Sequence, residues 1–347
     1  MMKINFILPF TGLTGGIRVD FLYCNYLISK GHDIVCYVPM IAYKFNNNLL
    51  NQIKASIGNT FKRRTNVKWF QCNFKIELVP KINNFFVRDA DFTIATAWPT
   101  AYDVVKLNEL KGKKIYFIQD YEIWSGKKVD VDGSYKLDLN RITVTKTLKE
   151  LLYNEFKVES EVIYNGLSDS EYIRVNKIHN DKKTILMLYN EDLRKGSKEG
   201  IEILSNLYEK YNIRVILFGV KKGNNIPNKF EFYENPDRDK LMSLYRESDI
   251  YLFTSKHESW GLPAIEAMAN KCAVVGNRVG FLNEIAKNEE EALIIDNFDY
   301  NLMCEKVEIL LNNEEKLSYI QENGYKLAEK FRWEDSFKNF EEYLRNI

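Results

Sequence analysis

The chain has 347 residues, of which 45% are hydrophobic and 28% charged, and its net charge is +1. This length favours two domains, and the composition allows each of them a core. No apolar run approaches the ~20 residues of a membrane-spanning helix. The apolar start is short and lacks a cleavage site, so it predicts a first strand rather than a signal peptide, and we expect a cytoplasmic protein.

The distribution of charge and cysteine narrows the class of protein further. Residues 1–165 carry a net charge of +7 and residues 166–347 one of −6, so the two halves are expected to differ in their partners. A basic surface attracts anionic lipid or nucleic acid. An uneven distribution of solvated charge, with no such partner, explains the difference between the halves equally well. We hypothesise that the first half touches an anionic membrane surface. Five scattered cysteines predict reduced thiols, and three histidines give no reason to expect a His-based metal site.

The first half opens with a strand-helix-strand pattern. Lys3–Phe10 predicts a strand, residues 11–18 a glycine-rich turn that contains Gly15 and Gly16, and Val19–Ser29 a helix. The turn does not have the spacing G-x-G-x-x-G, and no clear acidic residue follows the second strand to hold a ribose. Both features argue against a dinucleotide-dependent dehydrogenase. Residues 41–88 show no clear pattern.

A polar cluster follows a later strand of the first half. Lys113–Ile118 predicts a strand, and Gln119, Asp120, Tyr121 and Glu122 come directly after it. Open α/β sheets bind ligands at the carboxyl ends of their strands, so this segment is a site candidate. Asp120 would either orient an acceptor hydroxyl or cap the next turn.

Asp130 and Asp132 have the spacing of a metal-binding pair. They stand in a polar stretch with Gly133 and do not follow an apolar strand. We therefore predict a turn here and no metal site.

The second half repeats the pattern of a strand followed by polar residues. Lys183–Leu188 predicts a strand, which Arg194, Lys195 and Gly196 follow. Arg offers paired donors and Lys a point charge, so together they suit a diphosphate, although two solvated surface charges are the alternative.

The segment 257–269 carries the strongest functional signal. It follows the apolar strand Asp249–Thr254 and leads into a helix that is rich in Ala, Ile, Glu and Met. A helix start suits a phosphate, and Gly261 lets a ligand approach the backbone closely. Glu258 and Glu266 flank this start and can accept hydrogen bonds from sugar hydroxyls. The chemistry indicates a nucleotide sugar; the alternative is an ordinary strand-loop-helix with solvated glutamates.

Glu258 and Glu266, with seven residues between them and Ala267-Met268-Ala269 after them, resemble the E-x7-E signature of family 4 retaining glycosyltransferases. The resemblance implies an α/β protein of the GT-B fold, in which two Rossmann-like domains with parallel sheets face each other across a cleft. It implies an acceptor-binding domain over 1–165, a nucleotide-sugar-binding domain over 166–330, and a C-terminal helix, 331–347, that packs back on the first domain.

The segment Gln119–Glu122 resembles a branch of this family that includes bacterial rhamnosyltransferases of surface-polysaccharide synthesis. Many family members carry a histidine near this strand end, and this chain does not. The resemblance favours a deoxysugar donor such as rhamnose.

The resemblance also implies roles for individual residues. Backbone amides of the Glu258–Leu262 loop, with Lys195 and Arg194, would hold the diphosphate, while Glu266 would bind the ribose and Glu258 the donor sugar. The predicted catalytic residues are Glu258, Lys195 and Asp120. The predicted donor-binding residues are Gly15, Gly16, Arg194, Lys195, Glu258, Ser259, Trp260, Gly261, Leu262 and Glu266.

These roles predict a metal-independent transferase that uses a UDP-, GDP- or dTDP-linked sugar and no cofactor. Its acceptor would be a glycan or a lipid-linked molecule, with no nucleic acid as partner, and the protein would work in the cytoplasm, peripherally on the inner face of the membrane. Two other functions stay open: a GT-B-fold nucleotide-sugar epimerase, and a non-catalytic module that binds carbohydrate or nucleic acid.

Overall fold

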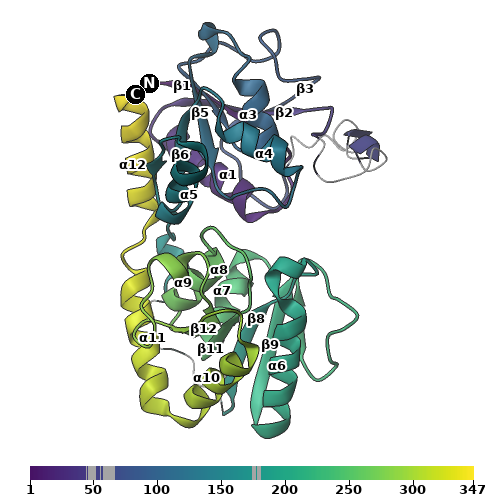
Figure 1. Cartoon of the computed structure of the whole chain (residues 1–347), viewed down its shortest axis with the longest axis vertical. Coiled ribbons are helices and arrows are strands. Elements are labelled where there is room, and N and C mark those ends of the chain that lie inside the picture. The colour runs from purple at the N-terminus through teal and green to yellow at the C-terminus, as the bar shows by residue number, and fades with distance from the viewer. Residues whose placement is uncertain (44, 46–51, 55, 58–66, 174–176, 178–180) are drawn as a thin grey trace. The chain divides into compact units, whose positions relative to one another are not determined.

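The computed structural model describes residues 1–347 except 44, 46–51, 55, 58–66, 174–176 and 178–180. The chain divides into two compact units. One consists of Met1–Tyr164 with Asp335–Ile347, and the other of Asn165–Glu334. In each unit helices pack on a single sheet (Figure 1).

The first unit contains a seven-stranded sheet in the order β3-β2-β1-β4-β5-β6-β7. All neighbouring strands are parallel. Its strands are β1 (Lys3–Ile7), β2 (Asp33–Pro39), β3 (Lys75–Val79), β4 (Phe92–Ala95), β5 (Lys113–Ile118), β6 (Asn140–Thr143) and β7 (Glu161–Val162). Its helices are α1 (Gly15–Ser29), α3 (Trp98–Val104), α4 (Lys128–Tyr135), α5 (Lys146–Phe156) and most of α12 (Trp333–Asn346).

The second unit contains a six-stranded, wholly parallel sheet in the order β10-β9-β8-β11-β12-β13. Its strands are β8 (Lys183–Leu188), β9 (Ile213–Gly219), β10 (Glu231–Glu234), β11 (Ile250–Phe253), β12 (Ala273–Asn277) and β13 (Leu293–Ile295). Its helices are α6 (Ser197–Lys210), α7 (Arg238–Glu247), α8 (Leu262–Ala269), α9 (Phe281–Glu284), α10 (Tyr300–Asn312) and α11 (Glu314–Ala328).

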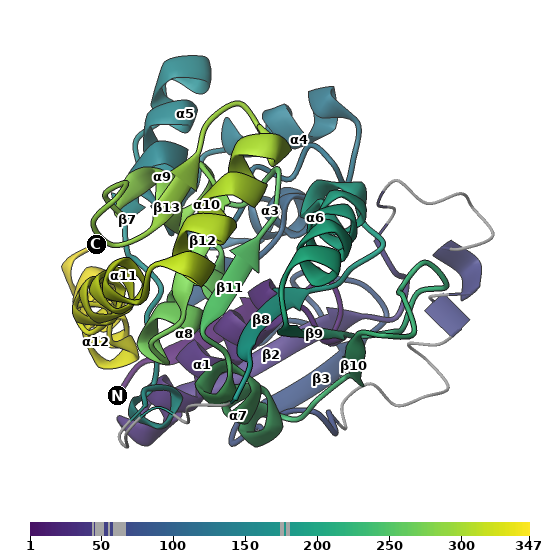
Figure 2. The same cartoon turned by 90° about the horizontal axis from the view of Figure 1, so that it is seen from below.

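Burial explains why these segments form a parallel sheet. Every residue of β11 and of β12 is buried, which is the pattern of strands covered on both faces. In the second unit α6 packs beside α10, and α8 beside α11 (Figure 2). Core side chains such as Leu217, Leu252 and Val275 are fully buried, and each contributes about 1.5–3 kcal/mol by leaving water.

The C-terminal helix α12 belongs mainly to the first unit. The Phe340 ring lies 4.6 Å from the Tyr23 ring of α1 and 5.7 Å from the Phe117 ring of β5, centroid to centroid. The His32 Nε2 lies 3.1 Å from Glu341 Oε1, and the His32 Nδ1 accepts a hydrogen bond from the Met2 amide. The final helix therefore closes the core of the unit that begins the chain.

The prediction of a glycine-rich turn over 11–18, followed by a helix from Val19, was wrong about where the helix begins. Gly15 and Gly16 are the first residues of α1, and Thr14 Oγ1 caps the helix by accepting from the Ile17 amide at 3.2 Å. The cap satisfies one of the orphan amides of the first turn. It thus outweighs the low helix propensity of the two glycines.

The turn predicted at Asp130–Gly133 is also contradicted, because these residues lie inside α4. The Tyr102 hydroxyl donates to the Asp130 carbonyl at 2.7 Å, and Lys128 forms an i,i+4 ion pair with Asp132. Val131 and Tyr135 of the same helix are fully buried. Tertiary packing here overrides the local preference of a polar, glycine-containing sequence.

The unpatterned stretch 41–88 contains a strand that sequence reasoning missed. β3 lies at the edge of the first sheet and, among the strands that the structure describes, pairs only with β2. Its five residues, KIELV, have no clean alternation of buried and exposed positions. Such a short edge strand gives little periodic signal.

Candidate functional site

The second unit concentrates the predicted site residues at one place in its topology. β8 and β11 are neighbouring parallel strands, and the strand order reverses between them. Lys195 follows β8 and Glu258 follows β11. The carboxyl ends of two such strands form the crevice in which open α/β sheets bind ligands.

The loop after β8 is tightly built. The side chain of Asp192 accepts from the Arg194 amide at 2.9 Å and so caps the short 3-10 turn Leu193–Lys195. The next residue, Gly196, has a φ of +62°, and a Cβ there would lie 2.3 Å from the Thr254 carbonyl oxygen. The Thr254 hydroxyl donates to the Lys195 carbonyl at 2.8 Å. Only glycine allows the two loops to approach this closely.

The loop after β11 is anchored from the neighbouring strand β12. The Asn277 side-chain amide donates to the carbonyls of Thr254 and Ser255, at 2.9 and 3.1 Å. The Trp260 ring packs against Phe281 and Phe331, with centroids 5.1 and 5.5 Å apart. Trp260 is thus a buried anchor of the loop.

The start of α8 has the properties of an anion site. Gly261 precedes the helix with a φ of +82°, and as a glycine it has no side chain with which to cap this end. The first amides of a helix have no partner within it, and the helix dipole makes this end positive. Pro263 has no N–H and the Ala264 amide donates to the Gly261 carbonyl at 3.0 Å, so among the first three residues of α8 the Leu262 amide is the one that can meet a ligand oxygen.

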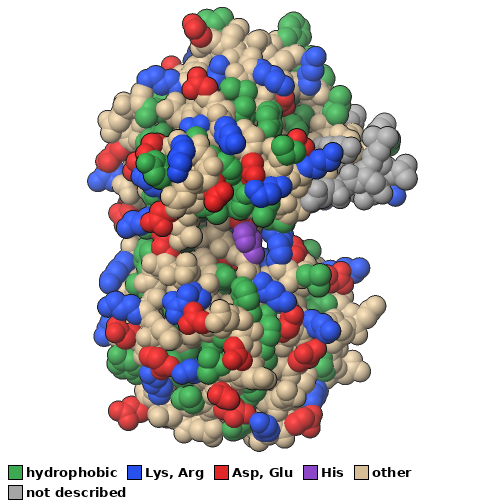
Figure 3. Space-filling model, viewed as in Figure 1, with side chains coloured by type: hydrophobic (Ala, Val, Ile, Leu, Met, Phe, Trp, Pro, Cys, Tyr) green, Lys and Arg blue, Asp and Glu red, His purple; other side chains and the backbone are tan. Residues whose placement is uncertain are grey.

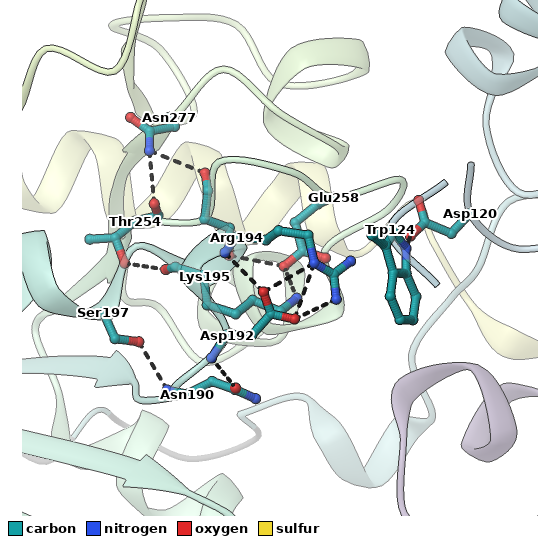
Figure 4. Close-up of polar contacts among 11 residues, drawn as sticks. Asp120, Trp124, Asn190, Asp192, Arg194, Lys195, Ser197, Thr254, Glu258 and Asn277 are labelled. Atoms are coloured by element: carbon teal, nitrogen blue, oxygen red, sulfur yellow. Dashed lines mark hydrogen bonds and ion pairs between the residues drawn. The ribbon is translucent and has the colours of Figure 1, made fainter. Parts of the chain in front are cut away.

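Lys195 and Glu258 meet in front of the two loops. The Lys195 Nζ lies 2.6 Å from Glu258 Oε1, which also accepts from the Ser255 hydroxyl at 2.9 Å. The side chains of Lys195 and Glu258 are 23% and 14% exposed. Figure 4 shows the lysine directed at the carboxylate across the space between the loops. The pair is half-buried and still reachable.

Arg194 is held by its own loop. The Arg194 Nε lies 3.1 Å from both carboxylate oxygens of Asp192 (Figure 4). Burial alone raises the pKa of Asp192, but the hydrogen bonds and charge of Arg194 outweigh it and hold that pKa below its usual value. The Arg194 guanidinium is therefore already paired with the Asp192 carboxylate, and a bound ligand would share the guanidinium with it.

Glu266 lies one turn into α8, and its carboxylate is enclosed. Its Oε1 is 2.7 Å from the Arg238 Nη2, its Oε2 accepts from the Tyr245 hydroxyl at 3.2 Å, and the side chain is 5% exposed. Sequence reasoning missed Arg238, because its polar neighbourhood carries no recognisable motif. Only tertiary structure brings it to Glu266.

The remaining predicted residues belong to the first unit. Gly16 lies against Gln119, whose side-chain amide donates to the Gly16 carbonyl at 3.2 Å and to Asp20 Oδ1 at 2.8 Å. Burial raises the pKa of Asp20 well above its usual value, and the charge of Glu122 adds to this effect. The carboxyl ends of β1 and β5 thus share a buried polar cluster.

Asp120 uses both of its carboxylate oxygens locally. Oδ1 accepts from the Tyr121 amide at 2.9 Å, and Oδ2 accepts from the Trp124 indole at 2.8 Å. Beside it, burial raises the pKa of Glu122 to about 8; the hydrogen bond from the Trp98 amide lowers it, and the charge of Asp120 raises it further. These contacts match the capping role for Asp120 and leave its acceptor role a prediction.

The structure therefore brings together Arg194, Lys195 and the Glu258–Leu262 loop in the second unit, with Glu266 on the helix behind that loop. Gly15, Gly16 and Asp120 lie in the first unit, at the carboxyl ends of β1 and β5.

An open cavity of about 720 Å³ lies elsewhere in the first unit. Its lining includes Phe92, Lys113 and Asn140, which begin β4, β5 and β6. It therefore lies at the amino ends of these strands, opposite the edge that carries Gln119 and Asp120, and is not part of the candidate site.

Two kinds of feature are absent from the described residues. They contain no group of three or more His, Cys, Asp or Glu side chains that could hold a metal ion. They also contain no helix of the length and apolarity needed to cross a membrane.

Comparison with known proteins places this architecture in a class. A structure of HepE from Anabaena, solved in complex with UDP and glucose, superposes with a TM-score of 0.76 over 100% of both chains at 12% sequence identity. The predicted GT-B fold, with two α/β units on parallel sheets, is confirmed.

The sequence of the second unit resembles a known family. Residues 168–327 match the family described as glycosyl transferases group 1. Residues 75–148 match a second family, described as the N-terminal domain of WsaF.

Curated relatives point to the same family. An uncharacterised glycosyltransferase of Methanocaldococcus jannaschii is 30% identical over 56% of this chain and 55% of its own length. The capsular polysaccharide biosynthesis glycosyltransferase CapM of Staphylococcus aureus is 23% identical over 59% of this chain and 62% of its own length. The chain thus spans only a little over half the length of each of these two relatives.

Proposed function

We propose that this protein transfers a sugar, with retention of configuration, from a nucleotide-diphosphate sugar to a glycan or lipid-linked acceptor in the synthesis of a surface polysaccharide or glycoconjugate. One observation carries the proposal: the Lys195–Glu258 pair, 2.6 Å apart, stands beside the uncapped start of α8 at the reversal of strand order. The relative CapM, named for capsular polysaccharide biosynthesis, supports the biological setting.

The leaving group is the centre of the proposed mechanism. The bond between the anomeric carbon and the diphosphate oxygen breaks, and the nucleoside diphosphate takes the electron pair. Backbone amides from Ser259 to Leu262, with Lys195 and Arg194, stabilise that charge. Preorganised donors of this kind usually contribute more to catalysis than any other single effect. The acceptor hydroxyl attacks from the same face, and its proton passes to the departing phosphate oxygen.

The two glutamates divide the rest of the donor between them. Glu258 accepts from hydroxyls of the sugar, and Glu266 from hydroxyls of the ribose. The Lys195 ammonium has three N–H donors, so one can stay on Glu258 while others reach the phosphate. Cationic side chains and the helix end supply the positive charge, and we propose that no metal ion takes part.

The donor would be UDP-, GDP- or dTDP-linked, and a deoxysugar such as rhamnose is favoured. This preference rests on the segment Gln119–Glu122, which lies inside the region that matches the WsaF N-terminal domain. In the first unit, Gly15 and Gly16 would approach the donor phosphates and the acceptor, and Asp120 would orient the acceptor hydroxyl.

We further propose that the protein works in the cytoplasm and touches an anionic membrane surface through its basic first half. On the face seen in Figure 3, basic and acidic side chains are interspersed, so the proposal rests on net charge rather than on one patch there. Sedimentation with neutral and with anionic liposomes tests it. Equal binding to both would contradict it.

Nucleotide release from a panel of sugar donors, with and without acceptor, tests the function. Release that requires acceptor supports the transferase, formation of an epimer supports the epimerase, and the absence of both products supports a binding module.

Lys195→Met should lower turnover at least tenfold, because the negative charge on the leaving diphosphate loses a hydrogen-bond donor. The matched control is Lys210→Met, which removes a lysine paired with Glu308 at the far end of α6.

A further inference from the structure

The orientation of the Glu266 carboxylate, which is assigned to the ribose, is fixed by two neighbouring side chains. Arg238 Nη2 and the Tyr245 hydroxyl each hold one oxygen of Glu266, at 2.7 and 3.2 Å. A carboxylate offers about four lone-pair sites, so these two contacts leave others for a ligand. Arg238 and Tyr245 both come from α7, which therefore determines where those sites point.

Arg238 is shared with a second buried carboxylate. The same Nη2 pairs with Glu171, whose side chain is 3% exposed, while the Arg238 side chain is 32% exposed. Burial lowers the pKa of Arg238, but the charges of Glu266 and Glu171 outweigh this effect and raise it. The guanidinium is thus a permanent cation between two enclosed anions, and its removal would leave both uncompensated.

The segment that supplies Glu171 is itself fixed. Glu171 Oε2 accepts from the Ser168 amide at 2.6 Å. The buried Asn270 side-chain amide donates to the backbone carbonyls of both Glu171 and Glu266, each at 2.8 Å. The end of α8 and the turn 169–171 therefore form one rigid support around the Arg238 guanidinium.

We propose that Arg238 is a positioning residue of the nucleotide site. It orients the Glu266 carboxylate toward the ribose hydroxyls, and its charge allows that carboxylate to stand near a diphosphate. The proposal rests on the function proposed above, and it adds a residue outside the two-glutamate motif. Sugar hydroxyls would be recognised by the Arg238–Glu266 pair, not by Glu266 alone.

The discriminating measurement is the preference for ribose. The tightest binder among UDP, GDP and dTDP is compared by calorimetry with its analogue that lacks one sugar hydroxyl. A hydrogen bond from a hydroxyl to a charged group corresponds to about a tenfold preference or more in the wild type. In Arg238→Gln this preference should fall to within about threefold, because the carboxylate is no longer oriented.

Three further variants separate positioning from stability. Arg238→Lys keeps the charge but not the planar fork, so it should fold and still lose much of the preference. Glu171→Gln keeps the Arg238–Glu266 pair and should keep the preference. Arg214→Gln is the matched control, because Arg214 also pairs with two carboxylates, Glu231 and Glu247, at the opposite end of the sheet. It should lower stability and leave the preference unchanged.

The outcomes distinguish this inference from the function on which it rests. If the wild type binds none of the three diphosphates, the proposed function fails and takes the inference with it. If the wild type prefers the hydroxylated form and both Arg238 variants do so equally, the inference alone is overturned. A wild type that binds without preference would remove the ribose role of Glu266, and with it the positioning role.

Discussion

The negative charge of Glu258 has two opposing effects on the candidate site. Its charge holds the Lys195 ammonium at 2.6 Å, yet the same charge would repel a diphosphate bound at the start of α8. The pair reduces the conflict because the positive charge of the lysine offsets that of the carboxylate. A negative group can then serve the sugar without rejecting the phosphate.

Glu258→Gln separates these two effects. The amide keeps the size of the side chain and one acceptor, but it no longer repels phosphate or accepts strongly from sugar hydroxyls. We expect turnover to fall roughly ten- to a hundredfold while the Kd for the nucleoside diphosphate stays equal or decreases, since one charged hydrogen bond is worth about 1.5–3 kcal/mol. Steady-state kinetics and calorimetry check this. Parallel losses of turnover and nucleotide affinity would contradict the sugar role.

Glu122 should make stability depend on pH. Burial raises its pKa from 4.5 to about 8 in the folded protein. The folded state therefore holds a proton that the unfolded state releases between these values, and stability falls as pH rises through that window, by up to about 1.4 kcal/mol per unit. Urea unfolding of Glu122→Gln, compared with the wild type at pH 5.5 and pH 8, should show a smaller difference. An unchanged difference would exclude Glu122 as its source.

Among single residues, the sequence allowed a prediction for those whose signal lies in the residues next to them in the chain. Lys195, Glu258 and Gly261 stand in the loops that follow apolar strands, and the parallel sheet brings the ends of those strands together. Arg238 and Asn277 could not be found in this way. Arg238 pairs with Glu266, which is 28 positions away in the sequence. Asn277 donates to the carbonyls of Thr254 and Ser255, which are 23 and 22 positions away.

At the scale of elements, strong periodicity gave accurate bounds. β5 and β8 begin and end at the predicted residues, because each is an apolar run between clear polar breaks. α1 begins four residues earlier than predicted because a threonine cap decides its start. α4 depends on a hydrogen bond from Tyr102, and β3 depends on its pairing with β2. Local sequence patterns do not contain information on such tertiary contacts.

The helix α12 offers a test at the same scale. Phe340 is fully buried against Tyr23 and Phe117. Phe340→Ala should destabilise the first unit by about 3–5 kcal/mol, which is the usual cost of emptying such a site. Urea unfolding followed by hydrogen exchange over α1 measures it. Glu342→Ala, on the exposed side of the same helix, is the control, and equal effects of the two would contradict the packing role.

For the whole molecule, the proposed function predicts a ligand response centred on one unit. A nucleoside diphosphate at a hundred times its Kd should stabilise the fold that binds it by about 2.7 kcal/mol. Hydrogen exchange should slow most at residues 193–197 and 258–264, where the loops after β8 and β11 meet α6 and α8. Protection centred on α10 and α11 instead would place the ligand away from Lys195 and Glu258.

The placement of α12 also has a consequence for biosynthesis. Residues 335–347 complete the unit that begins at Met1, yet the ribosome makes them only after all of Asn165–Glu334. Domains often fold as they emerge, but here the aromatic surface of Tyr23 and Phe117 waits uncovered for Phe340 while the second unit is synthesised. The first unit is therefore completed only after the second has been synthesised, and chaperones that recognise exposed rings have that interval in which to act.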